Sequence, residues 1–243
     1  MNDGSPIADV VGRMQQRLDE LPEEVAHRRY FLSTYLRTTQ AVGKAIDDAR
    51  FEDPDWVELW DVKFAELYLQ AHDADLAPRP WRLAFEASPE LPALGHVLLG
   101  INAHVNYDLP QALLEVISDE DFLDPALMNQ RRRDHERIDG VLSARVAAED
   151  EELAATGVRS LLDRVLTPLN RLSSQRFLRE SRQKVWHNTM ELQRARLHSA
   201  DAYHVRLAEL ELLAAARIAD LLAPGQVLLR LAVAGFGVVL PPP

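Results

Sequence analysis

Cysteine is absent from the 243-residue chain. This absence excludes a disulfide scaffold, a thiolate zinc site, an iron–sulfur cluster and a cysteine nucleophile. Positive charge is also scarce, because 27 Lys and Arg residues against 38 Asp and Glu residues leave a formal net charge of −11. Since binding to phosphate backbones or anionic lipid requires a basic surface, we expect no nucleic-acid partner and no docking on an anionic membrane.

Long apolar runs are missing as well. A transmembrane helix needs about 20 apolar residues. The most apolar segment, residues 227–240, is interrupted by Arg230 and two glycines. We expect that segment to form a last helix docked on the core, and we expect no transmembrane segment. The first residues, MNDGSPIADVV, have no basic stretch followed by an apolar one and therefore do not resemble a secretory signal. Together with the lack of cysteine, this favours a cytoplasmic location.

Strand signals are few, whereas helical signals recur along the whole chain. No Asn-Gly or Asp-Gly pair lies between runs of alternating polarity. Ile7, Val10, Val11 and Met14 form the first of several apolar stripes at helical spacing. The length suits one core. The sequence therefore predicts a single all-α domain over residues 1–243, a multi-helix bundle of seven to nine helices.

Proline, glycine and cap residues set the expected helix boundaries. Helices are expected over 7–21, 23–49, from 54 to the Pro-rich stretch at 77–81, 88–117 and 125–153. A shorter helix should end near Arg171, with Pro168 bending or ending it, and a long one should run from Ser173 or Ser174 through the 200s.

The most informative segment is residues 94–117, which are apolar on both sides of a polar centre. A helix that is apolar all round is a buried helix, yet this one carries Asn102, His104, Asn106 and Asp108 in its middle. Each buried polar group costs about 1–3 kcal/mol unless it finds a partner. Pro110 removes a backbone donor next to this polar band and should kink the helix.

Two histidine–aspartate pairs share the same spacing. His104 and Asp108 lie four residues apart, as do His135 and Asp139, so each pair occupies one face of a helix. If the two helices faced each other across the bundle, His104, Asp108, His135 and Asp139 could ligate one or two divalent metal ions. Mixed His and Asp ligands suit Zn²⁺, Mn²⁺ or Fe²⁺.

Other polar residues would complete such a site or oppose it. Asn102 and Asn106 would orient a substrate, and Tyr107 is either an acid or a packing residue. Arg182 falls on an apolar stripe and needs a carboxylate, for which Asp108 and Asp139 are candidates; that ion pair would compete with a metal. His187 and Glu191 share the spacing but lie on a charged face that we expect to be solvated.

The segment LLGINAHVNYDLPQAL resembles the signature of an uncharacterised, mainly actinobacterial domain-of-unknown-function family with a G-x-N-A-H-x-x-x-D-L core. The stretch DPDWVELWDVKFAELYLQA and the residues around Arg182 and Trp186 are also similar to that family. The resemblance implies an all-α fold, with the signature at Gly100, Asn102, His104, Asp108 and Leu109.

A more distant similarity links the H-x-x-x-D spacing of His104 and Asp108 to zinc-dependent phospholipases C and related single-strand nucleases. This chain lacks their metal-binding amino-terminal tryptophan and most of their histidine ligands. The similarity therefore implies one or two metal ions and not three.

Three hypotheses about function remain open, and whether the protein is an enzyme stays undecided. The first is a metal-dependent hydrolase-like enzyme acting on a small or lipid-like substrate, in which His104, Asp108 and His135 activate a bound water. The second is a non-enzymatic helical ligand-binding or interaction protein whose polar band is structural. The third keeps His104 and Asp108 as a metal-free acid–base dyad. A homo-oligomer is compatible with all three.

Overall fold

The computed structural model describes residues 4–156, 168–223 and 237–242, and it describes side chains outside 142–156 and 168–179. Every regular element in these ranges is a helix, so the predicted all-α multi-helix bundle is confirmed. None of the described helices has the length and apolar character needed to cross a membrane.

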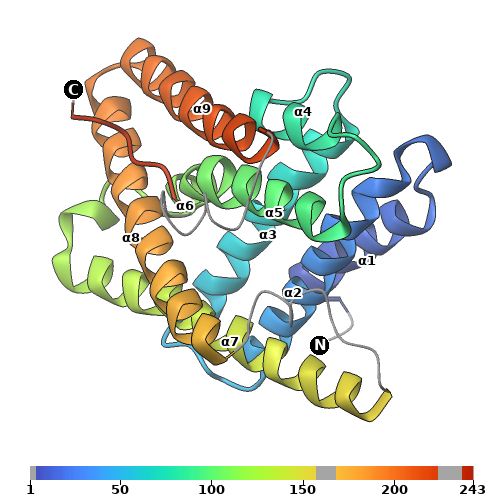
Figure 1. The fold of residues 1–243 in the computed structure, drawn as a ribbon. Coiled ribbons are helices and arrows are strands. Elements are labelled where there is room, and N and C mark those ends of the chain that lie inside the picture. The colour runs from blue at the N-terminus through green and yellow to red at the C-terminus, as the bar shows by residue number, and fades with distance from the viewer. Residues whose placement is uncertain (1–3, 157–167, 224–236, 243) are drawn as a thin grey trace.

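The first two α-helices form one side of the molecule, next to the third α-helix. Helix α1 (Pro6–Asp19) packs on α2 (Arg29–Asp47) and α3 (Pro54–Asp73), and a 3₁₀ turn (Glu23–Arg28) precedes α2 (Figure 1). The cap of α3 follows from its sequence, because Asp53 accepts a hydrogen bond from the Trp56 amide at 3.0 Å and proline occupies the first turn.

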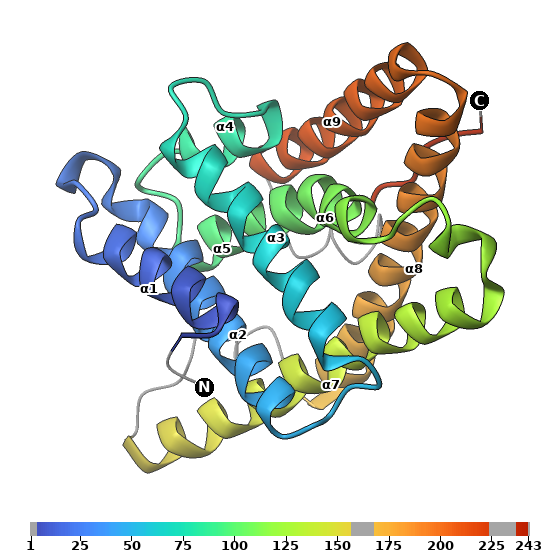
Figure 2. The same cartoon turned by 180° about the vertical axis from the view of Figure 1, so that it is seen from behind.

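The centre of the molecule is built from α3, α5 and α6. Helix α5 (Ala93–Ala103) passes into a π-helical turn (His104–Asp108) and then into α6 (Leu109–Val116). Helix α2 packs on α5, and α3 packs on α6; the short α4 (Arg79–Phe85) packs on α5 and α9 (Figures 1 and 2). The expected start at residue 88 is wrong, since α5 begins at Ala93.

The second half consists of three longer helices and an extended end. Helix α7 (Pro125–Thr156) packs on α2 and α8 (Pro168–His198), and α9 (Ala200–Leu222) packs on α8. Pro168 does not end a helix, because it is the first residue of α8; the expected start at Ser173 or Ser174 is wrong, and Ser199 divides the predicted long helix.

The C-terminal residues 237–242 are not helical. They run as an extended segment from beside α6 across α8, drawn in red in Figure 1. The last helix predicted over 227–240 is therefore wrong for residues 237–240, and residues 227–236 lie outside the described part. Leu240 is nevertheless fully buried, as docking on the core requires.

The described core has two clusters. The larger one takes its aromatic side chains mainly from α2, α3 and α4; these include Phe31, Tyr35, Trp56, Trp60, Phe64, Tyr68, Trp81 and Phe85. The smaller cluster lies between the π turn, α6, α8, α9 and the C-terminal segment; its buried members are Tyr107, Leu114, Leu192, Leu210, Ala214 and Leu240. The π turn therefore borders both clusters.

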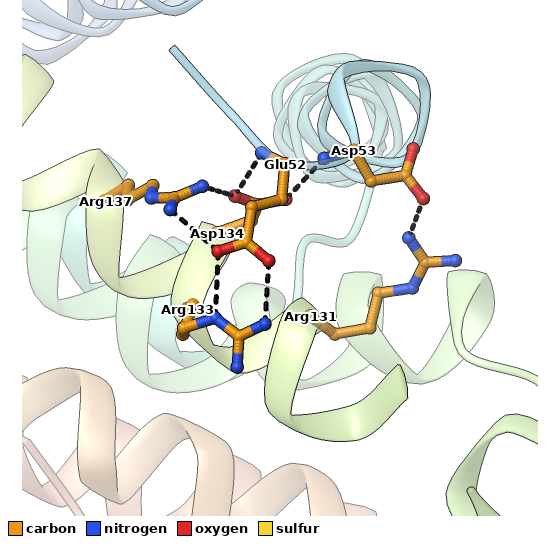
Figure 3. Close-up of polar contacts among 6 residues, drawn as sticks. All are labelled: Glu52, Asp53, Arg131, Arg133, Asp134 and Arg137. Carbon is orange, nitrogen blue, oxygen red and sulfur yellow. Dashed lines mark hydrogen bonds and ion pairs between the residues drawn. The ribbon is translucent and has the colours of Figure 1, made fainter. Parts of the chain in front are cut away.

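Helix α7 is fixed to the start of α3 by a buried carboxylate. Asp134, which is fully buried, accepts hydrogen bonds at 2.8 Å from the backbone amides of Glu52 and Asp53 (Figure 3). Arg137 donates to the same carboxylate at 2.8 Å, and Arg131 pairs with Asp53. A single side chain thus satisfies two amides of the loop that leads into α3.

Candidate functional site

The polar band forms a π-helical turn rather than a simple kink. The Leu109 amide donates to the His104 carbonyl, five residues earlier, and Pro110 follows in the first turn of α6. Because proline has no N–H, it cannot continue the α-helical ladder at this point. Wider turns of this kind are rare and occur frequently at functional sites. The turn makes the segment 104–108 the first candidate site.

His104 and Asp108 form a buried dyad, as their spacing predicts. His104 Nδ1 lies 2.9 Å from Asp108 Oδ2, and the indole N–H of Trp81 donates to the same oxygen at 2.8 Å. Both side chains are almost fully buried, with exposures of 3% and 2%. The role of Trp81 as a donor to Asp108 was not predicted from the sequence.

Aromatic rings enclose the imidazole on several sides. Phe64 stacks on His104 at a centroid distance of 3.5 Å and an interplanar angle of 5°, while the Tyr35 ring meets it edge-on at 4.3 Å. Phe31 and Trp81 lie within 6 Å of the same ring. His104 Nε2 points into these surroundings with no hydrogen-bond partner among the described residues. The dyad is therefore enclosed within the core.

Burial sets the charge of the dyad. It lowers the pKa of His104 well below the usual value for histidine. It also raises the pKa of Asp108 well above the usual range, although the hydrogen bond from Trp81 acts in the opposite direction. Both directions favour the uncharged form, so we expect a neutral imidazole beside a protonated carboxyl group at neutral pH.

The asparagines of the band face a different neighbour. The side chain of Asn106 donates to Asn102 Oδ1 at 3.1 Å, and Asn102 donates to the Leu98 carbonyl at 2.8 Å. The Val238 amide in turn donates to Asn106 Oδ1 at 3.4 Å. The two asparagines expected to orient a substrate thus connect α5 to the C-terminal segment.

The second histidine–aspartate pair does not make the corresponding contact. Asp139 forms an ion pair with Arg182, one of the two partners expected for that arginine. His135 lies between Trp60 and Trp186, with ring centroids 6.1 and 5.8 Å away. Burial and the nearby charge of Arg182 lower the pKa of His135 well below its usual value.

The two pairs do not converge. The Phe64 ring stacks on His104, and the centroid of the Trp60 ring lies 6.1 Å from that of Phe64. The His135 ring lies 6.1 Å from Trp60, so two aromatic rings connect the two imidazoles. Among the described residues, no three His, Asp or Glu side chains gather as a metal site would require. The arrangement of His104, Asp108, His135 and Asp139 therefore does not fit a shared metal ion, and metal binding itself stays a prediction.

A cavity of about 280 Å³ between α7 and α8 brings two of the predicted residues, His135 and Arg182, to one surface. Arg132, Trp186 and Arg194 also line it. The cavity is distinct from the His104–Asp108 dyad, because the rings of Trp60 and Phe64 connect His135 to His104. A small ligand in this cavity would lie against the His135 and Arg182 side chains, which are buried in its floor at exposures of 1% and 9%.

The charged face of α8 is less solvated than expected. Glu191 is only 5% exposed and pairs with Arg194 and Arg206. His187 is exposed, and its Nε2 lies 3.3 Å from the Leu240 carbonyl. The expectation of a fully solvated pair is therefore wrong for Glu191, because α9 and the C-terminal segment cover that part of α8.

A family model matches residues 7–224, which is most of the chain. The chain belongs to the family of unknown function DUF5995. This confirms the predicted membership in a domain-of-unknown-function family, whereas the actinobacterial origin and the distant similarity to phospholipases C stay predictions. No match was found among curated proteins or solved structures. Membership in DUF5995 supplies no reaction, so function must be argued from the geometry.

One buried carboxylate of this DUF5995 protein was not predicted from the sequence. Asp61 of α3 is 4% exposed, and its Oδ2 has no hydrogen-bond partner among the described residues. Burial raises the pKa of Asp61 to about 7. Burial raises the pKa of Tyr35, and Asp61 and Asp108 act in the same direction when they are ionised. A signal was present, because Asp61 stands midway between the apolar residues Val57 and Ala65 at four-residue spacing.

We expect Asp61→Asn to stabilise the protein by about 2–3 kcal/mol more at pH 8 than at pH 5. The folded state keeps the Asp61 proton up to a pKa of about 7, whereas the unfolded chain loses it near 3.8. Between these values the native state binds more protons, so wild-type stability falls as the pH rises, and asparagine removes this loss. Urea unfolding at both pH values measures the effect, with Asp55→Asn as a control for charge removal from α3. An equal gain at both pH values would contradict the prediction.

Proposed function

We propose that this DUF5995 protein is a non-enzymatic helical interaction protein whose buried polar band is structural. The observation that carries the proposal is the enclosure of the His104–Asp108 dyad by Phe64, Tyr35 and Trp81. A catalytic imidazole must reach its substrate within hydrogen-bond distance. Here the Nε2 atom that would do so is buried within an aromatic core.

The partners of the other candidate residues support the same proposal. Asp139 is neutralised by Arg182, and Asn102 and Asn106 bond to each other and to backbone groups. Such satisfied networks fix the relative positions of helices in a core. The cavity between α7 and α8 and the exposed side of the C-terminal segment are two surfaces that a partner could contact.

Metal addition separates this proposal from the hydrolase hypothesis. We expect Zn²⁺ or Mn²⁺ in excess to leave the Tm unchanged and elemental analysis of the purified protein to find substoichiometric metal. A ligand present at 100 times its Kd would stabilise the native state by about 2.7 kcal/mol, which is several degrees in Tm for a chain of this size. Differential scanning fluorimetry measures the shift.

Two variants make the metal experiment decisive. His104→Gln removes one proposed ligand in the core. Asp139→Asn removes another in the middle of α7, where misfolding is less of a risk because the side chain is 23% exposed. If the wild type held stoichiometric metal and either variant lost it, the proposal of a structural polar band would be overturned. The hypothesis of a metal-dependent hydrolase would then be favoured.

A further inference from the structure

The C-terminal segment, residues 237–242, is held on α8 mainly through its backbone. Asn188 of α8 binds it at two points: Nδ2 donates to the Val238 carbonyl at 3.0 Å, and Oδ1 accepts from the Leu240 amide at 2.9 Å. The Asn188 amide group thus takes the place of a neighbouring strand along residues 238–240.

Further side chains bind the remaining peptide groups on both sides of Asn188. Lys184 donates to the Gly237 carbonyl at 3.1 Å, and Arg206 of α9 donates to the Pro241 carbonyl at 2.6 Å. The Val238 amide also donates to Asn106 of the π turn at 3.4 Å. Three separate elements therefore bind the backbone of one extended segment, and these contacts do not depend on its side chains.

Only one side chain of the segment enters the protein deeply. Leu240 is fully buried in the smaller core cluster, whereas its neighbour Val239 is 45% exposed. This alternation is that of an extended strand, in which successive side chains point to opposite sides. Pro241 follows Leu240, and because proline has no N–H it adds no amide that would need a partner. Gly237 lies so close to Lys184 that a Cβ there would be 2.6 Å from Cδ.

We propose that the groove between α8, α9 and the π turn is a peptide-binding site for an extended, uncharged segment with a leucine followed by proline, and that the protein's own C-terminal segment occupies it as an internal ligand. Backbone recognition by side-chain amides with one apolar pocket is a general way to bind extended peptides. The inference rests on the proposed interaction function and names its partner. Asn106 then links the π turn to peptide binding.

The test uses the full chain and a labelled peptide with the sequence of residues 237–243, GVVLPPP. In Leu240→Asp the carboxylate cannot enter the apolar pocket, so the internal segment leaves the groove. We expect this variant to bind the free peptide at least tenfold more tightly than the wild type, in which the tethered segment competes at high effective concentration. Fluorescence anisotropy measures both affinities, and circular dichroism checks that the variant is folded.

A groove variant shows where the peptide binds. Adding Asn188→Ala to Leu240→Asp removes both backbone hydrogen bonds and should weaken peptide binding at least tenfold. Gln183→Ala, an exposed position on the same helix, is the matched control and should leave the affinity unchanged. A folded Leu240→Asp variant that does not bind the peptide, or binding that is unaffected by Asn188→Ala, would overturn the proposal.

Hydrogen exchange on the wild type provides a second test that requires no substitution. The Val238 and Leu240 amides should be protected, and excess free peptide should speed their exchange by displacing the internal segment. Protection that saturating peptide leaves unchanged would overturn the proposal, as would a wild-type dimer dissolved by Leu240→Asp, since it would assign the groove to the segment of a second copy. None of these outcomes changes the result expected from the metal experiment. Only that experiment tests whether the buried polar band is structural.

Discussion

Gly100→Ala is expected to destabilise the protein by about 3 kcal/mol, at the upper end of overpacking effects. A Cβ on Gly100 would lie closer than 3.0 Å to Phe31. The Phe31 ring has no free direction in which to move, because it packs against Tyr35, Tyr68 and Trp81. Chemical unfolding measures the loss, and a Tm reduced by about 5–10 °C should accompany it.

A second glycine provides a control for which the expected change in stability has the opposite sign. Gly140 lies on the exposed side of α7, and a Cβ there would meet nothing within 4 Å. Gly140→Ala should therefore stabilise the protein by about 0.5–1 kcal/mol, since alanine favours a helix interior over glycine. If both variants changed stability alike, close packing of α5 on α2 would not be the reason for glycine at position 100.

Asp134→Ala is expected to cost about 3–5 kcal/mol. The substitution would leave the Glu52 and Asp53 amides without their acceptor and Arg137 without its buried partner (Figure 3). Urea unfolding followed by circular dichroism gives the change in free energy. Because only the ion pairs of α7 with Glu52 and Asp53 would then hold it to the start of α3, proteolysis of the loop before α3 should also become faster.

An exposed acidic residue on the same helix isolates the effect of burial. Glu136, which pairs with Arg132 at the surface of α7, can be changed to glutamine; we expect no measurable loss, as is usual for exposed ion pairs. A small effect of Asp134→Ala, comparable to that of Glu136→Gln, would show that the two loop amides find other partners and that the carboxylate does not fix α7.

Local signals in the sequence were sufficient to predict where several helices start. Asp124 and Pro125 predict the start of α7, and Asp124 accepts from the Ala126 and Leu127 amides. The start predicted at Ser88 failed for an equally local reason. A helix beginning at Pro89 would need the amide of its fourth residue to donate to the Ser88 carbonyl, and that residue is Pro92, which has none.

Contacts within the candidate site could be predicted only where both side chains lie on the same helix. The spacing of His104 and Asp108 gives their hydrogen bond, whereas the equal spacing of His135 and Asp139 gives no bond because Arg182 of α8 takes the carboxylate. Spacing shows which residues share a face but not which residue a neighbouring helix places opposite. Trp81 and Asn188 were missed for this reason, since both contact partners more than 25 residues away.

The π turn has a consequence for insertions and deletions in this segment. The π turn holds one residue more than a regular α-helical turn. This one turn presents His104 to the aromatic cluster and Tyr107 to the smaller cluster. Deleting one residue between 104 and 108 would therefore close the turn to a regular α-helical one while α6 keeps its orientation, whereas inserting one residue would rotate α6 by about 100° about its own axis. On such an insertion Leu113 and Leu114, which serve different clusters, would both lose their places, so we expect this turn to tolerate the loss of a residue better than a gain.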